Sequence, residues 1–168
     1  MRLAPAFALA AALLTAACGF QPLYDGGVDG AVRAGIAGVE VGPIADRLGQ
    51  EMRNRLIERM GSGAHSDYRL DVVLNTETEG FGIRSDAAAT QEQMILTAVI
   101  RLTPIGKDMP VIEDTLRART SYDLVLSDYA TVAEREDAAR RLAFELAERI
   151  HRRLALYFNQ KDKEKTGR

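Results

Sequence analysis

Several residue types that build common functional sites are scarce in this chain of 168 residues, which has one cysteine, two histidines and no tryptophan. A single cysteine cannot close an internal disulfide. His65 and His151 have no cysteine or carboxylate at ligand spacing beside them, so we expect no structural zinc site. Aromatic residues make up 6% of the chain, and acidic residues outnumber basic ones by 24 to 22. This composition argues against the basic, aromatic-rich surfaces that bind nucleic acids.

No group of residues has the spacing of a catalytic centre. Glu77 and Glu79 share one face of a predicted strand, as paired acid and base carboxylates do, but an exposed strand beside arginines explains them more simply. Ser62 lies outside any nucleophile elbow, and Gly80-Phe81-Gly82 lacks the strand-to-helix setting of a phosphate loop. We therefore expect no catalytic residues, no metal and no cofactor, a pattern that favours binding or assembly over catalysis.

The start of the chain is organised around its only cysteine, Cys18. Met1-Arg2 supplies a positive charge, residues 3–17 are uncharged and apolar, and Ala16-Ala17 provides small residues at a cleavage point. This is the layout of a secretory signal peptide. The apolar run is too short and too rich in alanine to make a good membrane-spanning helix. We expect residues 1–17 to be a signal peptide that is removed.

The stretch Leu14-Thr15-Ala16-Ala17-Cys18 resembles a bacterial lipobox, in which the cysteine receives a thioether-linked diacylglycerol and becomes the acylated first residue. Known lipoboxes prefer Leu, Val or Ile where this chain has Thr15. The alternative is an ordinary secretory signal that leaves Cys18 as a free thiol. One acyl chain, such as palmitate, holds a protein weakly at a membrane, whereas two or more hold it firmly. A triacylated Cys18 would therefore anchor the protein without any hydrophobic patch on the folded domain.

The mature chain divides into three parts by composition. Residues 18–35 include a glycine-rich stretch and are predicted to form a lipidated flexible tether. Residues 36–158 form one domain, which is long enough to bury a core without disulfides. Residues 159–168 form a charged tail that we expect to fray.

The first two elements of the domain are a strand and a helix. Ile36 to Val41 alternates as a strand does, and Gly42-Pro43 ends it. Asp46 is placed to cap the helix that follows, and Gly61-Ser62-Gly63 stops that helix. The apolar stripe of the helix recurs every four residues and consists of Leu48, Met52, Leu56 and Met60.

Three more strands and a long helix complete the domain. Alternating apolar residues predict strands at 68–78, 91–103 and 111–122, with a long hairpin tip at 80–89. The last helix is predicted from about Thr131 to Phe158. Its apolar stripe consists of Ala139, Leu142, Ala143, Leu146, Ile150, Leu154 and Tyr157.

This order of elements predicts an α+β fold: a two-layer sandwich in which a four-stranded mixed sheet carries two helices on one face. The first helix joins two strands that can pair in parallel, and the remaining strands pair antiparallel. The other face of the sheet carries arginines and glutamates that can form cross-strand pairs. Val73, Ile95 and Val99 also lie on that face, which indicates partial cover by a partner.

Short motifs spread along the chain resemble the LPS-assembly lipoproteins of the LptE family, in their alphaproteobacterial form. The mature start, Cys18-Gly19-Phe20-Gln21-Pro22-Leu23-Tyr24, resembles theirs closely. The match continues through Val39-Glu40-Val41, Pro43-Ile44 and Arg47-Leu48-Gly49-Gln50, and resumes near the last helix with Ser121-Tyr122, Ser127-Asp128-Tyr129-Ala130 and the Ala- and Arg-rich stretch to Phe158. The order and spacing of these motifs carry the resemblance.

The resemblance implies a location, partners and candidate binding residues. Members of the family are lipid-anchored at the periplasmic side of the Gram-negative outer membrane. They plug and help assemble the LptD β-barrel, with which they deliver lipopolysaccharide to the cell surface. Family members bind lipopolysaccharide through basic residues, and the positions that correspond here are Arg84, in the hairpin, and Arg135, at the start of the last helix. The alternative function is a periplasm-facing lipoprotein that carries lipid for an envelope transporter.

Overall fold

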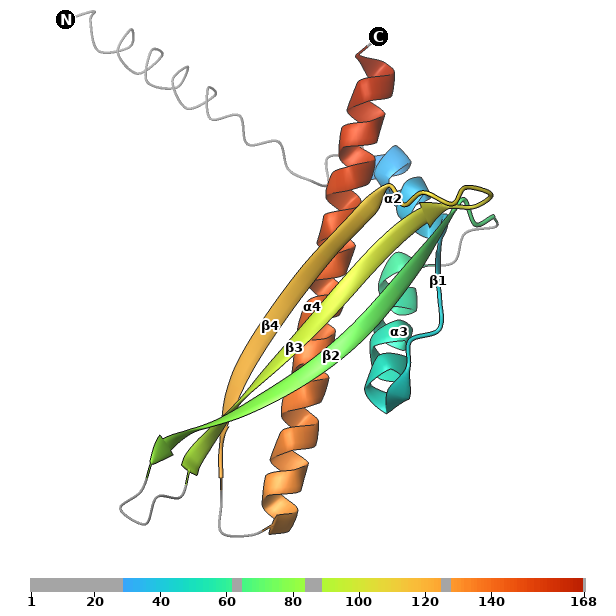
Figure 1. The fold of residues 1–168 in the computed structure, drawn as a ribbon. Coiled ribbons are helices and arrows are strands. Elements are labelled where there is room, and N and C mark those ends of the chain that lie inside the picture. Colours follow the sequence, from blue (N-terminus) through green and yellow to red (C-terminus); the bar gives the residue numbers. More distant parts are fainter. Residues whose placement is uncertain (1–28, 62–64, 84–88, 125–127, 168) are drawn as a thin grey trace, which may run out of the picture. The chain divides into compact units, whose positions relative to one another are not determined.

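A four-stranded sheet in the order β1-β2-β3-β4 forms one layer of the computed structural model, and helices form the other (Figure 1). The structure describes residues 29–61, 65–83, 89–124 and 128–167. Residues 31–168 form one unit, which contains the whole sheet and the helices packed on it. In chain order the elements are α2 (Asp29–Ala37), β1 (Val39–Val41), α3 (Asp46–Met60), β2 (Tyr68–Ile83), β3 (Ala89–Pro104), β4 (Ile112–Asp123) and α4 (Asp128–Thr166).

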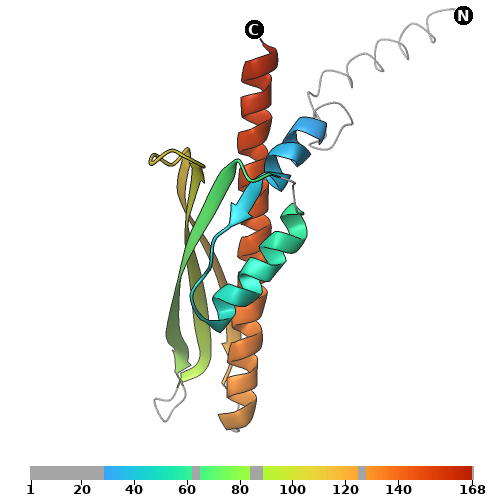
Figure 2. The same cartoon turned by 90° about the vertical axis from the view of Figure 1, so that its right-hand side faces the viewer.

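The sheet is mixed, as the order of elements predicts. β1 pairs in parallel with the first residues of β2, Val39 facing Tyr68 and Val41 facing Leu70, and α3 makes the connection between these two strands. β2, β3 and β4 form an antiparallel meander in continuous register. Figure 2 shows the sheet from its edge, with α3 and α4 on the same side of it. The predicted α+β two-layer fold is therefore confirmed.

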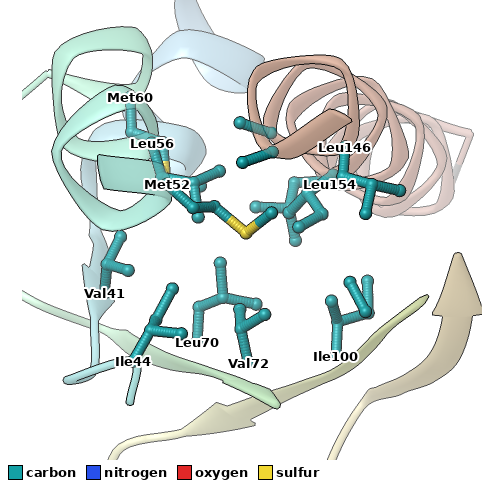
Figure 3. Packing of buried hydrophobic residues seen from close by; sticks show 14 of the residues in the cluster. Val41, Ile44, Met52, Leu56, Met60, Leu70, Val72, Ile100, Leu146 and Leu154 are labelled. Carbon is teal, nitrogen blue, oxygen red and sulfur yellow. The ribbon is translucent and has the colours of Figure 1, made fainter. Parts of the chain in front are cut away.

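The core lies between the sheet and the two long helices. The even-numbered residues point toward the helices in β4, in the Tyr68–Leu74 part of β2 and in the Glu92–Pro104 part of β3, and we call this the covered face; the odd-numbered residues of the same stretches form the open face. Met52 and Leu56 of α3 meet Leu146 and Leu154 of α4 above Ile100 of β3 (Figure 3). The predicted stripes of both helices are buried or partly buried in this cluster, because the helical repeat turns each stripe toward the sheet.

Two boundaries differ from the prediction at the start of the domain. A helix, α2, begins at Asp29 where part of a flexible tether was expected, and the strand expected from Ile36 is reduced to Val39–Val41. The helix forms because Val32 and Ile36 bury their side chains in the core. Residues 18–28 of the expected tether lie outside the described residues.

The caps and ends of the later helices also differ from the prediction. Asp46 makes no capping hydrogen bond; it is the first residue of α3 and has a φ of 66°, a left-handed conformation that Asp tolerates. α4 begins at Asp128 and continues to Thr166, through most of the tail that was expected to fray. The tail contains good helix formers such as Gln, Lys and Glu, and no glycine or proline before Gly167.

Candidate functional site

Three polar side chains meet between the sheet and the first turns of α4, near the β2–β3 hairpin. Glu92 of β3 and Tyr122 of β4 are direct neighbours in the strand register. Arg135 of α4 places its Nη2 2.9 Å from Oε2 of Glu92, and its Nε donates to the Tyr122 hydroxyl at 3.1 Å. The Tyr122 hydroxyl donates in turn to the same glutamate oxygen. We call these three residues the hairpin-end cluster.

The hairpin-end cluster stabilises the charged form of both of its ions. The hydrogen bond from Tyr122, followed by that from Arg135, holds the pKa of Glu92 below its usual value. Burial, together with the bond to Glu92, raises the pKa of the Tyr122 hydroxyl. The pKa of Arg135 is raised, first by its bond to Tyr122 and then by Glu92. The cluster is therefore an ion pair with a neutral phenol at neutral pH.

Of the three predicted site residues, the structure describes only Arg135. Cys18 and Arg84 lie outside the described residues. Two of the three guanidinium nitrogens of Arg135 are already bonded within the protein, while 47% of its side chain remains exposed. An anion could therefore approach Arg135 from solvent without displacing it from the sheet.

Sequence reasoning did not identify Glu92 and Tyr122 as partners of Arg135. Both are even-numbered strand residues, so the alternation that places Met94 and Ala118 on the covered face places them there too. A carboxylate at the end of a covered face requires a cation to pair with it. That requirement was the available signal for a basic residue on the helix above.

Three arginines on the helix surface, Arg55, Arg59 and Arg140, form ion pairs between α3 and α4. Glu148 lies 3.0 Å from a nitrogen of Arg55 and 2.6 Å from Nε of Arg59. Arg55 also lies over the ring of Phe144, at 5.8 Å from its centroid. Glu51 joins one arginine from each helix in the same way. These arginines hold the two helices together along their outer seam, so they are poor candidates for a ligand site.

Two arginines without an ion pair lie on the open face of the sheet. Arg117 and Arg119, on β4, have no ion pair with any residue that the structure describes. They line a hollow with Ile95 of β3, Glu77 of β2 and, at the β4 edge of the sheet, Arg149 of α4. In the register Glu77, Ile95 and Arg119 form one row across the sheet. The row runs from acidic through apolar to basic. Val73 is 67% exposed on the same face, so the predicted mixture of charged and apolar residues on the open face is confirmed.

Metal ligands and membrane-spanning segments are the remaining features that could define a site. Over the described ranges, no three His, Cys, Asp or Glu side chains are grouped to hold a metal ion. His151 lies partly buried on α4, and burial lowers the pKa of its imidazole. None of the described helices has the length and apolar character needed to cross a membrane.

Fold and site together define a class: an α+β domain with helices on one face of a mixed sheet, an open and partly basic opposite face, and a polar cluster beside a long hairpin. Residues 36–154 match the LptE family, described as Lipopolysaccharide-assembly. The chain belongs to this family.

Individual relatives agree with this assignment. An uncharacterized protein of Rickettsia prowazekii is 31% identical over 123 residues, which cover 73% of this chain and 78% of that protein. The fold is similar to that of a crystallised lipoprotein from Caulobacter crescentus, with 24% identity, a TM-score of 0.62 and coverage of 77% of this chain and 96% of that one. It is also similar to the rare lipoprotein B of Shewanella oneidensis, with 14% identity, a TM-score of 0.61 and coverage of 74% and 98%. At these identities the two structures support the fold.

Proposed function

We propose that this chain is a non-enzymatic, lipid-anchored subunit of the outer membrane that plugs and helps assemble an LptD-type β-barrel and assists delivery of lipopolysaccharide to the cell surface. The observation that carries the proposal is the match of residues 36–154 to the lipopolysaccharide-assembly family. The domain also has the surface that such a plug needs. Large outer-membrane barrels have polar interiors, and both the outer helix seam and the open sheet face are rich in charge.

The anchor in this proposal is a lipid on Cys18. The sequence around Cys18 has the order of a lipoprotein signal, with a charged start, an apolar run and small residues before the cysteine. Cys18→Ser is expected to leave the fold intact and to release the protein from washed membranes, because the acyl chains supply the membrane affinity. Mass spectrometry of the mature amino terminus checks the modification directly. An unmodified thiol would remove the anchor from the proposal.

Lipopolysaccharide is proposed to contact Arg84 and Arg135, which would bind its phosphates through charge-assisted hydrogen bonds. The two positions predict different outcomes. Arg84→Glu is expected to weaken lipopolysaccharide binding with little change in stability. Arg135→Glu would in addition place a second carboxylate beside Glu92, so a loss of binding there has to be compared with the loss of stability. Unchanged affinity in Arg84→Glu would take that residue out of the site.

The plug itself is tested by crosslinking in living cells. A photoreactive residue at Arg101 or Val73, both exposed on the open face, is expected to yield an adduct with the mass of the chain plus an outer-membrane barrel. The same residue at buried Leu146 serves as the control, because it faces the core. Recovery of the chain without a barrel, in cells where the barrel matures normally without it, would contradict the proposal and favour a lipid carrier.

A further inference from the structure

The turn between β3 and β4, residues 105–111, carries several exposed apolar side chains close together. Nine large hydrophobic side chains are exposed in the described residues, and three of them, Ile105, Met109 and Val111, lie within this turn, at 55%, 78% and 41% exposure. Lys107 donates its amide to Pro104, and Gly106 between them has a φ of 81°. This is the geometry of a β-turn with glycine at its third position, which holds Ile105 at an outer corner.

The turn lies at the end of the domain where the amino-terminal part of the chain joins it. Gly38, directly after α2, accepts hydrogen bonds from the amides of Asp67 and Tyr68. The carbonyl of Asp67 accepts in turn from the amide of Ile105 at 2.9 Å. Asp67 therefore connects the end of α2 to the start of the turn through two backbone hydrogen bonds. Figure 1 shows α2 and the turn near the same end of the sheet. The hairpin between β2 and β3 lies at the other end.

We infer that this turn is a second membrane contact, in which Ile105, Met109 and Val111 enter the lipid surface to which Cys18 is anchored; the inference rests on the proposed lipid anchor. Ala31 follows Cys18 by thirteen positions in the sequence, a stretch that spans at most about 45 Å when fully extended. An acylated Cys18 thus limits the distance of the α2 end of the domain from the bilayer to at most about 45 Å, so this end is the one that the anchor brings within reach of lipid.

The chemistry of the turn fits a lipid surface better than a protein groove. Its apolar side chains are on a protruding turn rather than in a hollow, and small apolar tips of this kind bind at the boundary between headgroups and acyl chains. Lys107 has an aliphatic stem that can follow them while its ammonium stays among the headgroups. Asp108, also exposed, offsets the charge of Lys107. The contact is therefore driven by apolar area and is expected to change little with salt.

The absence of tryptophan in the chain allows a clean test. In Met109→Trp, and separately in Val73→Trp, the new indole is the only one in the protein. Both positions are exposed, but Val73 lies on the open face of the sheet, away from the turn. The mature chain carries a hexahistidine tag in place of Cys18 and is tethered to phosphatidylethanolamine/phosphatidylglycerol vesicles that contain a nickel-chelating lipid, with or without brominated acyl chains.

The inference predicts that brominated lipid quenches the reporter at position 109 and shifts its emission to the blue, at low and high salt alike, while the reporter at position 73 is unaffected. Val111→Trp should give the same result as Met109→Trp, so a structural defect caused by one of the two substitutions would not decide the outcome. Equal quenching at 109 and 73 would indicate general adsorption and overturn the inference. A reporter at position 109 that brominated lipid does not quench would also overturn the inference. The same holds if a purified barrel partner, and not lipid, protects that reporter from quenching by iodide. Because the tag replaces Cys18, these results do not depend on lipidation, which mass spectrometry tests separately.

Discussion

The two ends of α4 are fastened to the sheet by similar bonds set in different surroundings. At the hairpin end, Arg135 donates to the hydroxyl of Tyr122, which is bonded to Glu92. At the α2 end, Lys161 donates to the hydroxyl of Tyr68. Each end thus pairs a basic residue of the helix with a tyrosine of a strand. Only the hairpin end adds a carboxylate, and only the α2 end adds an aromatic cluster.

The aromatic cluster at the α2 end consists of Tyr68, Tyr157 and Phe158, with ring centroids 5.2 to 6.4 Å apart in edge-to-face arrangements. Gly35 of α2 lies directly against the Phe158 ring. The α2 end is therefore held by packing, which is insensitive to salt and pH. The hairpin end depends on an ion pair that solvent reaches, so it is the end expected to loosen first. In the proposed function, lipopolysaccharide binds at that looser end.

Removing the phenyl ring at the centre of the α2 end is expected to have the largest effect. Phe158 is buried and contacts both tyrosines, so Phe158→Ala should lower the free energy of unfolding by about 3–5 kcal/mol. Urea denaturation of the mature chain with Cys18→Ser measures the change. Tyr129→Ala, at a position 84% exposed, is the control and should change stability little. A small effect at Phe158 would show that packing does not dominate at this end.

Adding a methyl group at the same contact is expected to have the next largest effect. A Cβ at Gly35 would lie 2.6 Å from Cδ1 and 2.8 Å from Cγ of Phe158, so Gly35→Ala should destabilise by about 1–3 kcal/mol. Gly30, in the same helix, has nothing within 4 Å of the corresponding position. Gly30→Ala should therefore stabilise, by less than the ~0.5–1 kcal/mol of a mid-helix position because Gly30 lies in the first turn. If urea denaturation gives the two variants the same sign, the α2–α4 contact is not close-packed.

The covered face could be predicted from the sequence because burial there repeats with the period of each element. Leu96 and Ile100 lie on one face of a strand because side chains alternate there with a period of two residues. Leu142 and Leu146 lie on one face of a helix because they are four residues apart. Pattern alone therefore identifies the buried face of each element. α2 was missed because its apolar pattern is short: only Val32 and Ile36, one helical turn apart, are buried. The close approach of Gly35 to the ring of Phe158, which is far away in the chain, is not visible in such a short pattern.

The candidate site was only partly predictable. Arg135 was identified by resemblance to a family, but its partners depend on the register that places Glu92 beside Tyr122. Register is set by the turns and the whole hydrophobic pattern of the meander, so a single residue does not reveal it. Gly49 is a similar case: a Cβ there would come within 3 Å of the backbone of Ile44, a constraint that is visible only in three dimensions.

Neutralising the carboxylate of the hairpin-end cluster is expected to have a smaller effect that depends on pH. The folded-state pKa of Glu92 is below its usual 4.5, so its charge stabilises the fold above that pH, and this stabilisation is lost as the pH falls below 4.5. Glu92→Gln should therefore cost about 1 kcal/mol near pH 7, because the pair is partly exposed, and little in acid. Urea denaturation of parent and variant across this pH range tests the convergence. Glu113→Gln removes the exposed pair with Arg101 and should cost less than about 0.5 kcal/mol.

The smallest effect is expected from the cation at the α2 end. Lys161 lies 4.9 Å from the centroid of the Tyr68 ring as well as donating to its hydroxyl, and the bond to Tyr68 is the main cause of its raised pKa. Lys161→Met keeps most of the aliphatic contact, so it should cost only about 0.5–1 kcal/mol, in the range of an accessible cation–π pair. Lys165→Met, at an exposed position one turn further along the helix, is the matched control for the loss of a positive charge near the helix end. A loss at Lys161 as large as that in Phe158→Ala would mean that both ends of α4 are held by charge, and would remove the contrast between them.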